Sequence, residues 1–246
     1  NGLKEFLAQN QVTAQQMIAC GLLVAGDDIA VPFDRFRNRL MFPIEDFRGR
    51  VVAFGGRAMS PEARAKYLNS PETELFHNRR TLYNGQMARQ AAHDGKPLVV
   101  VEGYMDVIAC VQAGFHGAVA PLGTALTDEH LGLLWKMTQT PILCFDGDSA
   151  GQRAAARSMD VMLPMLKPGQ SAKIVTLPEG VDPDDLIKSE GRKGFEDLLA
   201  SAVPLSQAIW NRETQNANVE TPEARAELEA RIRGLANEIV DQSVKK

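Results

Sequence analysis

Residues 97–106 read PLVVVEGYMD, a short apolar run that ends at an acidic residue and a glycine. A continuous apolar run of this length is typical of a β-strand that helices cover on both faces. The segment that follows, YMDVIACVQAG (104–114), has helical periodicity and ends in glycine. A buried strand that leads directly into a helix predicts one unit of a parallel α/β sheet.

The same strand–helix pattern returns along the rest of the chain. A strand at HGAVAPLG (116–123) precedes a helix at TDEHLGLLWKMT (127–138), which Thr127 is expected to cap. PILCFDGD (141–148) and KIVTLPEG (173–180) are two more buried strands, and each precedes a helical segment. Strands that alternate with such helices predict an α/β fold, with about four parallel strands sandwiched between helices.

Different segments flank this central sheet. Residues 3–25 predict two short helices, and RNRLMFPI (37–44) with RVVAFGGR (50–57) predicts a β-hairpin. The segment TLYNGQMARQAAH (81–93) is expected to be helical, and the carboxyl-terminal stretch is rich in Glu, Arg and Ala and helical in pattern. We therefore expect three domains: a small, basic, mixed α/β subdomain at 1–90, the sheet domain at 91–202 and a helical subdomain at 203–246.

The formal net charge is −4, but the charge is unevenly distributed. Residues 33–89 carry eleven Lys or Arg against six Asp or Glu, whereas residues 90–200 carry nine against fifteen. A basic module followed by an acidic one suits a protein that contacts phosphates with one half and cations with the other. Chance variation of solvated surface charge would also produce this pattern.

The cysteines and histidines give no sign of a metal or disulfide site. Cys20, Cys110 and Cys144 are widely spaced in apolar stretches and are expected to be buried thiols. The four histidines form no ligand spacing, so we expect no zinc. The sequence has no signal-peptide pattern and no apolar run of roughly 20 residues, so we expect a cytoplasmic protein without membrane contact.

Acidic residues follow three of the expected strands. Glu102 ends the first strand, Asp146 and Asp148 end the third, and Asp182 and Asp184 follow the fourth. In an open parallel sheet, ligands bind at the carboxyl ends of the strands. The acids are therefore expected to meet at one edge of the sheet.

A further acid, Asp106, lies four residues after Glu102 and should point back toward the same edge from the first turn of its helix. Carboxylates gathered at one edge repel one another unless protons or cations neutralise them. Mg²⁺ prefers oxygen ligands and is typically held by one or two carboxylates plus substrate phosphate. The pattern predicts a divalent-metal site, in which two ions would activate a 3′-hydroxyl and neutralise a leaving pyrophosphate.

Each acidic motif has a structural alternative when it is taken alone. The Glu-Gly pair at 102–103 could be a strand end entering a tight turn, and the Asp-Gly-Asp triplet at 146–148 could be ordinary turn chemistry. The Asp-Pro pair at 182–183 could be a helix N-cap followed by proline at the first helical position, which is compatible with a functional role. None of these alternatives explains why all three sets would lie at the same edge of one sheet.

Arginines alternate with other residues in the basic module. Arg35, Arg37 and Arg39 are expected to lie on one strand and share a face, while Phe36 and Leu40 face the core. Such a row would contact the phosphates of a template strand or hybrid without sequence preference. It could equally be a solvated face of a sheet.

Four motifs together resemble the toprim domain of bacterial DnaG-type primases. They are VVVEGYMDVIA (99–109), PLGTALT (121–127), CFDGDSAGQRAA (144–155) and DPDDLI (182–187). The resemblance extends upstream through DRFRNRLMFPIEDFRGRVVAFGGR (34–57) and KYLNSPET (66–73), segments more specific to primases, and covers residues 1 to about 230.

The resemblance implies a Mg²⁺-dependent RNA polymerase that copies single-stranded DNA into short RNA primers from NTPs by two-metal nucleotidyl transfer, with Mn²⁺ able to substitute. Glu102, Asp146 and Asp148 would act in catalysis. The metal site would comprise Glu102, Asp106, Asp146, Asp148, Asp182 and Asp184. Nucleotide or template contacts would come from Arg35, Arg37, Arg39, Arg57, Lys66, Tyr67, Asn69 and Arg79.

The implied partners are single-stranded DNA, NTPs and the RNA–DNA hybrid, at the nucleoid or replication fork. A replicative helicase and a zinc-binding domain would bind through family segments that lie outside this sequence. For that reason we expect the chain to bind NTP and metal but to start primers poorly alone.

Two other functions stay open. One is a toprim nuclease or topoisomerase fragment, although none of Tyr67, Tyr83 and Tyr104 is convincingly placed as a nucleophile. The other is a non-catalytic module whose basic face binds nucleic acid or a regulator.

Overall fold

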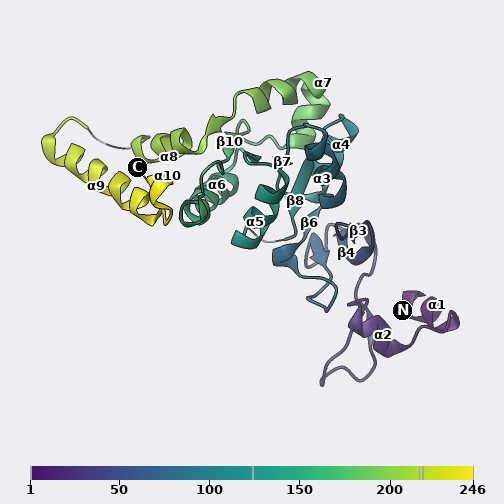
Figure 1. Cartoon of the computed structure of the whole chain (residues 1–246). Helices are drawn as coiled ribbons and strands as arrows, with labels where there is room; N and C mark the ends of the chain where they lie inside the picture. The colour runs from purple at the N-terminus through teal and green to yellow at the C-terminus, as the bar shows by residue number, and fades with distance from the viewer. Residues whose placement is uncertain (1, 124, 216, 218, 246) are drawn as a thin grey trace.

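The computed structural model describes residues 2–123, 125–215, 217 and 219–245. These residues form three sheets, the largest of which has six strands and lies at the centre of the molecule (Figure 1). In spatial order its strands are β11 (Val203–Pro204), β10 (Lys173–Thr176), β9 (Ile142–Phe145), β7 (Val99–Val100), β8 (Ala118–Pro121) and β6 (Leu82–Tyr83).

The four inner strands are parallel, as the sequence predicted. The two edge strands, β6 and β11, are antiparallel to their neighbours and were not predicted. β11 contains Pro204, which has no backbone N–H to donate.

Helices cover both faces of this sheet. Val99 and Val101 pack into a core with α4 and α7, whereas Leu98 and Val100 pack into the opposite core with α5 and α6. Successive residues of a strand point to opposite faces, so the run of consecutive apolar residues is explained by burial on both sides. These helices are α4 (Tyr104–Gln112), α5 (Asp128–Met137), α6 (Ser149–Met162, continued by a 3₁₀ turn at Leu163–Met165) and α7 (Pro183–Ala200).

The amino-terminal ninety residues form a separate arrangement of short elements. The predicted hairpin is present as β3 (Arg39–Glu45) and β4 (Val51–Ala58), with β5 (Tyr67–Asn69) added to its edge. Ile44 and Phe76 are fully buried in the core beneath this sheet, which also includes Tyr104 of α4. The remaining elements are α1 (Gly2–Gln9), α2 (Ala14–Ala19), β1 (Leu23–Val24), β2 (Phe33–Asp34), a 3₁₀ turn (Asn78–Arg80) and α3 (Gly85–His93).

The prediction that three arginines share a face of one strand is wrong. β2 ends at Asp34 and β3 begins at Arg39, and Asn38 between them has a positive φ of 51°. A backbone turn at this point breaks the alternation. Leu40, which was expected to face the core, is 48% exposed.

Two other local predictions are also wrong. Leu82 and Tyr83 were expected to be helical but pair with Pro121 and Ala120 in the sheet, because tertiary pairing outweighs the local helical pattern. Cys20 was expected to be buried but is exposed, whereas the other two thiols are buried as predicted.

The carboxyl-terminal helices lie at the opposite end of the molecule from α1 and α2 (Figure 1). They pack on the α6 side of the sheet through Leu205 and Ala208, which are buried, and through the partly buried Leu235 and Ile239. In the described ranges no helix is both long and apolar enough to cross a bilayer. The helices are α8 (Leu205–Thr214), α9 (Pro222–Glu238) and α10 (Gln242–Lys245).

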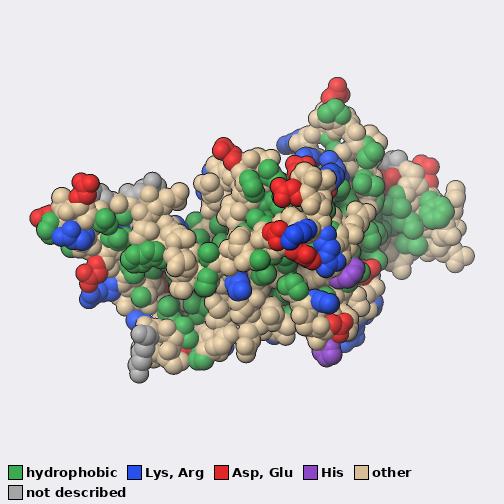
Figure 2. All heavy atoms as spheres, turned by 90° about the horizontal axis from the view of Figure 1, so that it is seen from above, with side chains coloured by type: hydrophobic (Ala, Val, Ile, Leu, Met, Phe, Trp, Pro, Cys, Tyr) green, Lys and Arg blue, Asp and Glu red, His purple; other side chains and the backbone are tan. Residues whose placement is uncertain are grey.

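The surface seen in Figure 2 is mixed in character. Acidic and basic side chains lie side by side over the region of α7, where Arg192 pairs with Glu196 and Lys193 with Asp197. At the amino-terminal end apolar side chains are open to solvent. Phe6 of α1 is 61% exposed.

Candidate functional site

The carboxyl ends of β7, β9 and β10 lie next to one another, because the three strands are parallel neighbours. Glu102 follows β7, Asp146 directly follows β9, and Asp182 caps α7 after β10. Together with Asp106 and Asp184 these side chains line one cavity of about 340 Å³, which we call the acidic pocket. The structure therefore brings together five of the six acids that the sequence singled out.

Two glycines allow the chain to turn sharply after β9. A Cβ atom on Gly147 would lie 2.0 Å from the carbonyl oxygen of Pro178, and one on Gly151 would lie 2.1 Å from that of Asp146. Real Cβ atoms do not approach backbone this closely, so both positions require glycine. The glycines of the FDGDSAG segment allow the turn that places Asp146 in the lining of the pocket.

Backbone N–H groups orient several of the acids. Glu102 Oε1 accepts from the N–H of Asp146 at 3.2 Å, which links the ends of β7 and β9. Asp106 Oδ2 accepts from the N–H of Gly103 at 2.9 Å, within the first turn of α4. Asp182 Oδ1 accepts from the N–H of Asp185 at 2.7 Å and caps α7, as the sequence suggested.

The electrostatic cost of this cluster falls on two carboxyl groups. Burial, together with the charges of Glu102, Asp182 and Asp148, raises the pKa of Asp146 to about 7. Burial, together with the charges of Asp146 and Asp182, likewise raises the pKa of Asp106 to about 7. Both groups would ionise fully at neutral pH only if a cation offset the repulsion.

The acids suit a hydrated divalent ion. Asp146 Oδ1 is buried and has no hydrogen-bond partner in the described part of the chain, so one ligand atom is free. Over the same residues no three His, Cys, Asp or Glu side chains already stand close enough to enclose an ion. Mg²⁺ fits such a site, because it keeps several waters and usually takes only one or two carboxylates plus substrate phosphate.

The opposite wall of the acidic pocket is basic and comes from the amino-terminal sheet. Arg57 of β4, Lys66, and Tyr67 and Asn69 of β5 all line the cavity. Lys66 Nζ lies 5.9 Å from the centre of the Tyr67 ring. The pocket thus places cations opposite the carboxylates, which is the arrangement needed to hold a phosphate group between them.

Tyr104 joins the two walls, and sequence reasoning did not single it out for this role. Its hydroxyl donates to Asn69 Oδ1 at 2.8 Å, and its ring stacks on Phe42 with centroids 4.9 Å apart. A Cβ atom on Gly55 would lie 2.5 Å from the Tyr104 ring, so β4 passes directly against it. The signal in the sequence was the tyrosine inside the acidic motif, but its partner Asn69 lies 35 residues away.

Met105, Pro121 and Gly123 also line the pocket and were not predicted as site residues. Pro121 and Gly123 belong to the 121–127 motif quoted for the family resemblance, in which Thr124 lies outside the described residues.

Several predicted residues lie outside the lining of the acidic pocket. Asp148 is exposed and caps α6 by accepting from the N–H groups of Ala150 and Gly151. Arg79 pairs with Asp128 and Glu129 at the start of α5.

The three arginines of the basic module make separate local contacts. Arg35 donates to the carbonyl of Asn69, and Arg39 donates to that of Gly56. Arg37 lies over the ring of Phe33 at 4.9 Å. Arg35 therefore touches the site only through the backbone of a pocket residue.

Comparison with known proteins gives two family matches. The DNA primase catalytic core, N-terminal domain, matches residues 1–89, and the Toprim domain matches residues 96–176. The first match contains the basic wall of the pocket and the second contains Glu102, Asp106 and Asp146, whereas Asp182 and Asp184 lie beyond it.

Individual relatives align over most or all of the chain. The DNA primase of Escherichia coli K12 is 42% identical over 245 residues, which cover 100% of this chain but 42% of that protein. A crystal structure of a DNA primase domain from Pseudomonas aeruginosa matches with a TM-score of 0.89 at 42% identity, over 94% of this chain and 72% of that one. The DnaG primase catalytic domain bound to single-stranded DNA matches with a TM-score of 0.87 at 41% identity, over 100% of this chain and 76% of that one. The chain spans less than half the length of the curated relatives it matches.

Proposed function

This chain belongs to the family of bacterial DnaG-type DNA primase catalytic cores, and from that premise we propose that it carries the nucleotidyl-transfer centre of an RNA polymerase that copies single-stranded DNA. The observation that carries the proposal is the acidic pocket, in which carboxylates from three strand ends face Arg57 and Lys66 across one cavity. We also propose that the division near residues 90 and 202 separates the basic, toprim and helical parts.

In this reaction a 3′-hydroxyl oxygen bonds to the α-phosphorus of an NTP. The bond from that phosphorus to the bridging oxygen breaks, and pyrophosphate leaves with the electron pair. The hydroxyl proton passes to a base, for which we propose Glu102, because its carboxylate lines the pocket beside Asp146. Arg57 and Lys66 would bind the triphosphate, because fixed cations stabilise the charge that moves onto the leaving group.

We propose that Asp146, Asp182, Asp184 and Asp106 hold Mg²⁺ with Asp148 in support, and that Mn²⁺ can substitute. When bound, the metal supplies positive charge that polarises the phosphate and lowers the pKa of the attacking hydroxyl. Lys188 pairs with Asp184 in the present arrangement, so it would release that carboxylate when an ion binds.

The template and its hybrid are proposed to lie against the basic module. Tyr67 and Asn69 offer a ring and an amide at the pocket wall, which suit stacking and hydrogen bonding without sequence choice. Arg37 and Arg79 are proposed as outer phosphate contacts. Contacts with a replicative helicase and a zinc-binding domain remain predictions for family segments beyond this chain, as does a place at the replication fork.

Extension of an annealed RNA primer tests the proposal directly. Asp146→Asn should lower NTP incorporation by at least about a hundredfold, because even outer partners of metal ligands contribute 10–100-fold. The matched control is Asp197→Asn, which removes a carboxylate of α7 that pairs with Lys193 outside the pocket lining. It should retain activity within about twofold.

Incorporation by Asp146→Asn equal to that of the control would overturn the metal assignment. Nicking of supercoiled DNA without NTP incorporation would instead favour the toprim nuclease alternative.

A further inference from the structure

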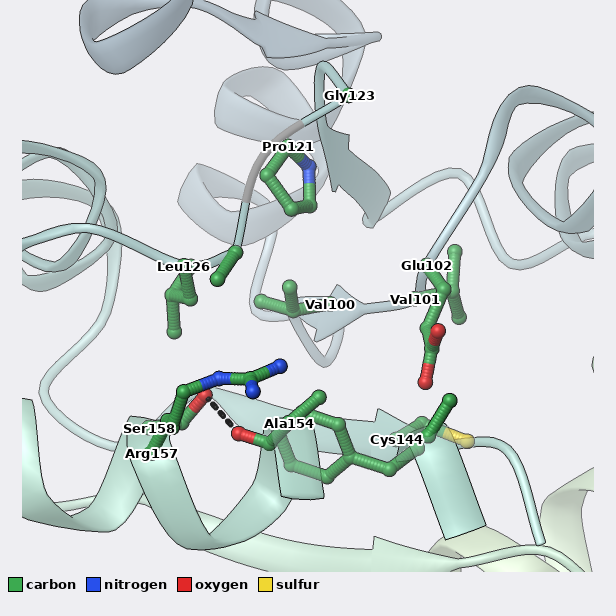
Figure 3. A pocket seen from close by; sticks show the side chains of 13 residues that line it. Val100, Val101, Glu102, Pro121, Gly123, Leu126, Cys144, Ala154, Arg157 and Ser158 are labelled. Atoms are coloured by element: carbon green, nitrogen blue, oxygen red, sulfur yellow. Dashed lines mark hydrogen bonds between the residues drawn. The ribbon is translucent and has the colours of Figure 1, made fainter. Parts of the chain in front are cut away.

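A second cavity, of about 320 Å³, lies on the other side of Glu102 from the basic wall. It shares Glu102, Pro121 and Gly123 with the acidic pocket, so the two cavities are neighbours along one edge of the sheet. We call it the α6 cavity, because α6 forms its floor. Figure 3 shows Glu102 entering it from the end of β7 and Arg157 reaching in from α6.

Small side chains on α6 create the space. Ala150, Ala154 and Ser158 are spaced by four residues, so they lie on one face of the helix and line the cavity. The hydroxyl of Ser158 is already used, because it donates to the carbonyl of Ala154 at 2.8 Å (Figure 3). The remaining walls are largely apolar side chains such as Val100 and Phe145.

Arg157 is the cation of this cavity. Its side chain is exposed, and no ion pair or side-chain hydrogen bond engages it among the residues that the structure describes. An unpaired guanidinium over an apolar floor suits a ligand that combines an anionic group with an uncharged ring, such as a ribose phosphate.

The proposed reaction needs such a ligand at this place. Templated transfer joins two nucleotides, and the acceptor must present its 3′-hydroxyl from the side opposite the incoming triphosphate, since attack and departure are roughly in line. The basic wall with Arg57 and Lys66 serves the triphosphate, so the acceptor would approach Glu102 from the α6 side.

We propose that the α6 cavity is the acceptor-nucleotide site, which seats the ribose and 5′-phosphate of the initiating nucleotide with Arg157 as its phosphate contact. The inference rests on the proposed polymerase function. The base projects from the cavity to pair with the template, so the site takes any ribonucleotide.

A ribonucleoside monophosphate separates the two sites, because it has a 3′-hydroxyl but no pyrophosphate to lose. The experiment uses GMP, an α,β-methylene analogue of GTP, Mg²⁺ and an oligodeoxycytidine template. Equilibrium dialysis should count two nucleotides per wild-type chain. Arg157→Gln should weaken GMP binding by about tenfold and leave the affinity for the GTP analogue unchanged. Ala154→Phe, which fills the cavity without changing charge, should do the same.

Arg153→Gln is the matched control. Arg153 lies one turn earlier on α6, is exposed and unpaired among the described residues, and lines a different cavity. It should bind both nucleotides as wild type does.

A single bound nucleotide per wild-type chain would overturn the acceptor-site proposal. An equal loss of GMP affinity in Arg157→Gln and Arg153→Gln would overturn it too. Primer extension by the wild-type chain in the same buffer tells the two failures apart. If the wild-type chain extends primers but binds one nucleotide in dialysis, only the acceptor-site proposal is wrong. If it does not extend primers, the polymerase proposal is wrong as well.

Discussion

Asp146 has three acidic neighbours, is partly buried, and keeps one carboxylate oxygen without a hydrogen bond in the described part of the chain. A carboxyl group whose pKa is raised on folding binds its proton more tightly in the folded state than in the unfolded state. Its contribution to stability is therefore present at low pH and is lost as the pH rises from about 4 to about 7.

Removing this charge should stabilise the metal-free protein at high pH. In EDTA at pH 8, Asp146→Asn should raise the free energy of unfolding by roughly 1 kcal/mol, or Tm by about 2–4 °C. At pH 5 the difference between the variant and wild type should shrink, because the wild-type carboxyl is then protonated. Thermal unfolding across this pH range measures the difference. A constant difference across the range would contradict the assigned repulsion.

Gly55 lies so close to Tyr104 that it controls how the basic wall meets the acidic wall. Gly55→Ala should destabilise the fold by about 1–3 kcal/mol, because the added methyl forces the aromatic ring or the strand to move. Gly132→Ala is the control, since a Cβ there meets nothing within 4 Å in the interior of α5. It should be neutral or stabilising by about 0.5–1 kcal/mol. Chemical denaturation compares the two, and equal stabilities would disprove the close contact.

The 3₁₀ turn at Asn78–Arg80 is joined to α5 through a fully buried histidine. His130 Nδ1 accepts from the N–H of Thr127, so Nε2 carries the proton and donates to the carbonyl of Asn78 at 2.8 Å. Burial lowers the pKa of His130 below the usual histidine pKa of about 6.5. The neutral ring therefore contributes its full stability when the pH is above about 6.5, and this contribution is lost as the pH falls below that value.

Breaking this link should loosen the basic module from the toprim sheet. His130→Leu keeps the apolar volume but leaves the carbonyls of Asn78 and Thr81 without their partner, so it should cost about 1–3 kcal/mol. His93→Leu, at an exposed position on α3, should stay within about 0.5 kcal/mol of wild type. Denaturant midpoints at pH 7.5 measure both, and a neutral His130→Leu would show that the turn is held by other contacts.

At the level of strands and helices, the sequence predicted most of the central sheet, because buried parallel strands read as continuous apolar runs and their helices carry caps. Thr127 caps α5 as expected, and Asp182 caps α7, which was the structural alternative for the Asp-Pro pair. β6 was missed, because two residues next to a helical pattern have no strand signal without their partner β8. The arginine row was misread, because the positive φ of Asn38 cannot be seen in an alternating pattern.

The site was predictable where topology alone decides it. The carboxyl ends of parallel strands must meet at one edge of the sheet. The sequence therefore predicted that Glu102, Asp146 and Asp182 lie together, as they do in the acidic pocket. The role of Tyr104 and the second cavity beside Glu102 depend on packing between distant segments, which periodicity does not encode. The metal and nucleotide roles of these residues remain predictions.

The whole molecule carries a net charge of −4, yet residues 33–89 carry eleven Lys or Arg against six Asp or Glu. Binding of single-stranded DNA should therefore weaken as salt increases, with a slope of about −0.7 in log affinity per phosphate contact. Replacing both Arg37 and Arg79, the proposed outer phosphate contacts, with Gln should make the slope less steep by about 1.4. Fluorescence anisotropy at salt concentrations between about 50 and 200 mM measures the slope. Lys167→Gln is the control. An unchanged slope in the double variant would place the DNA elsewhere.

The short antiparallel strands at the two sides of the central sheet also affect how copies of this protein behave when crowded. β11 ends the sheet with Pro204, and β6 has only two residues before Asn84 turns the backbone to a positive φ. A second chain could not add a regular strand to the sheet at either edge. At β11 the N–H donor is missing at Pro204, and after β6 the backbone turns away at Asn84. The sheet that carries the acids at its rim is thus protected at both edges, and we expect the protein to resist edge-to-edge aggregation at high concentration.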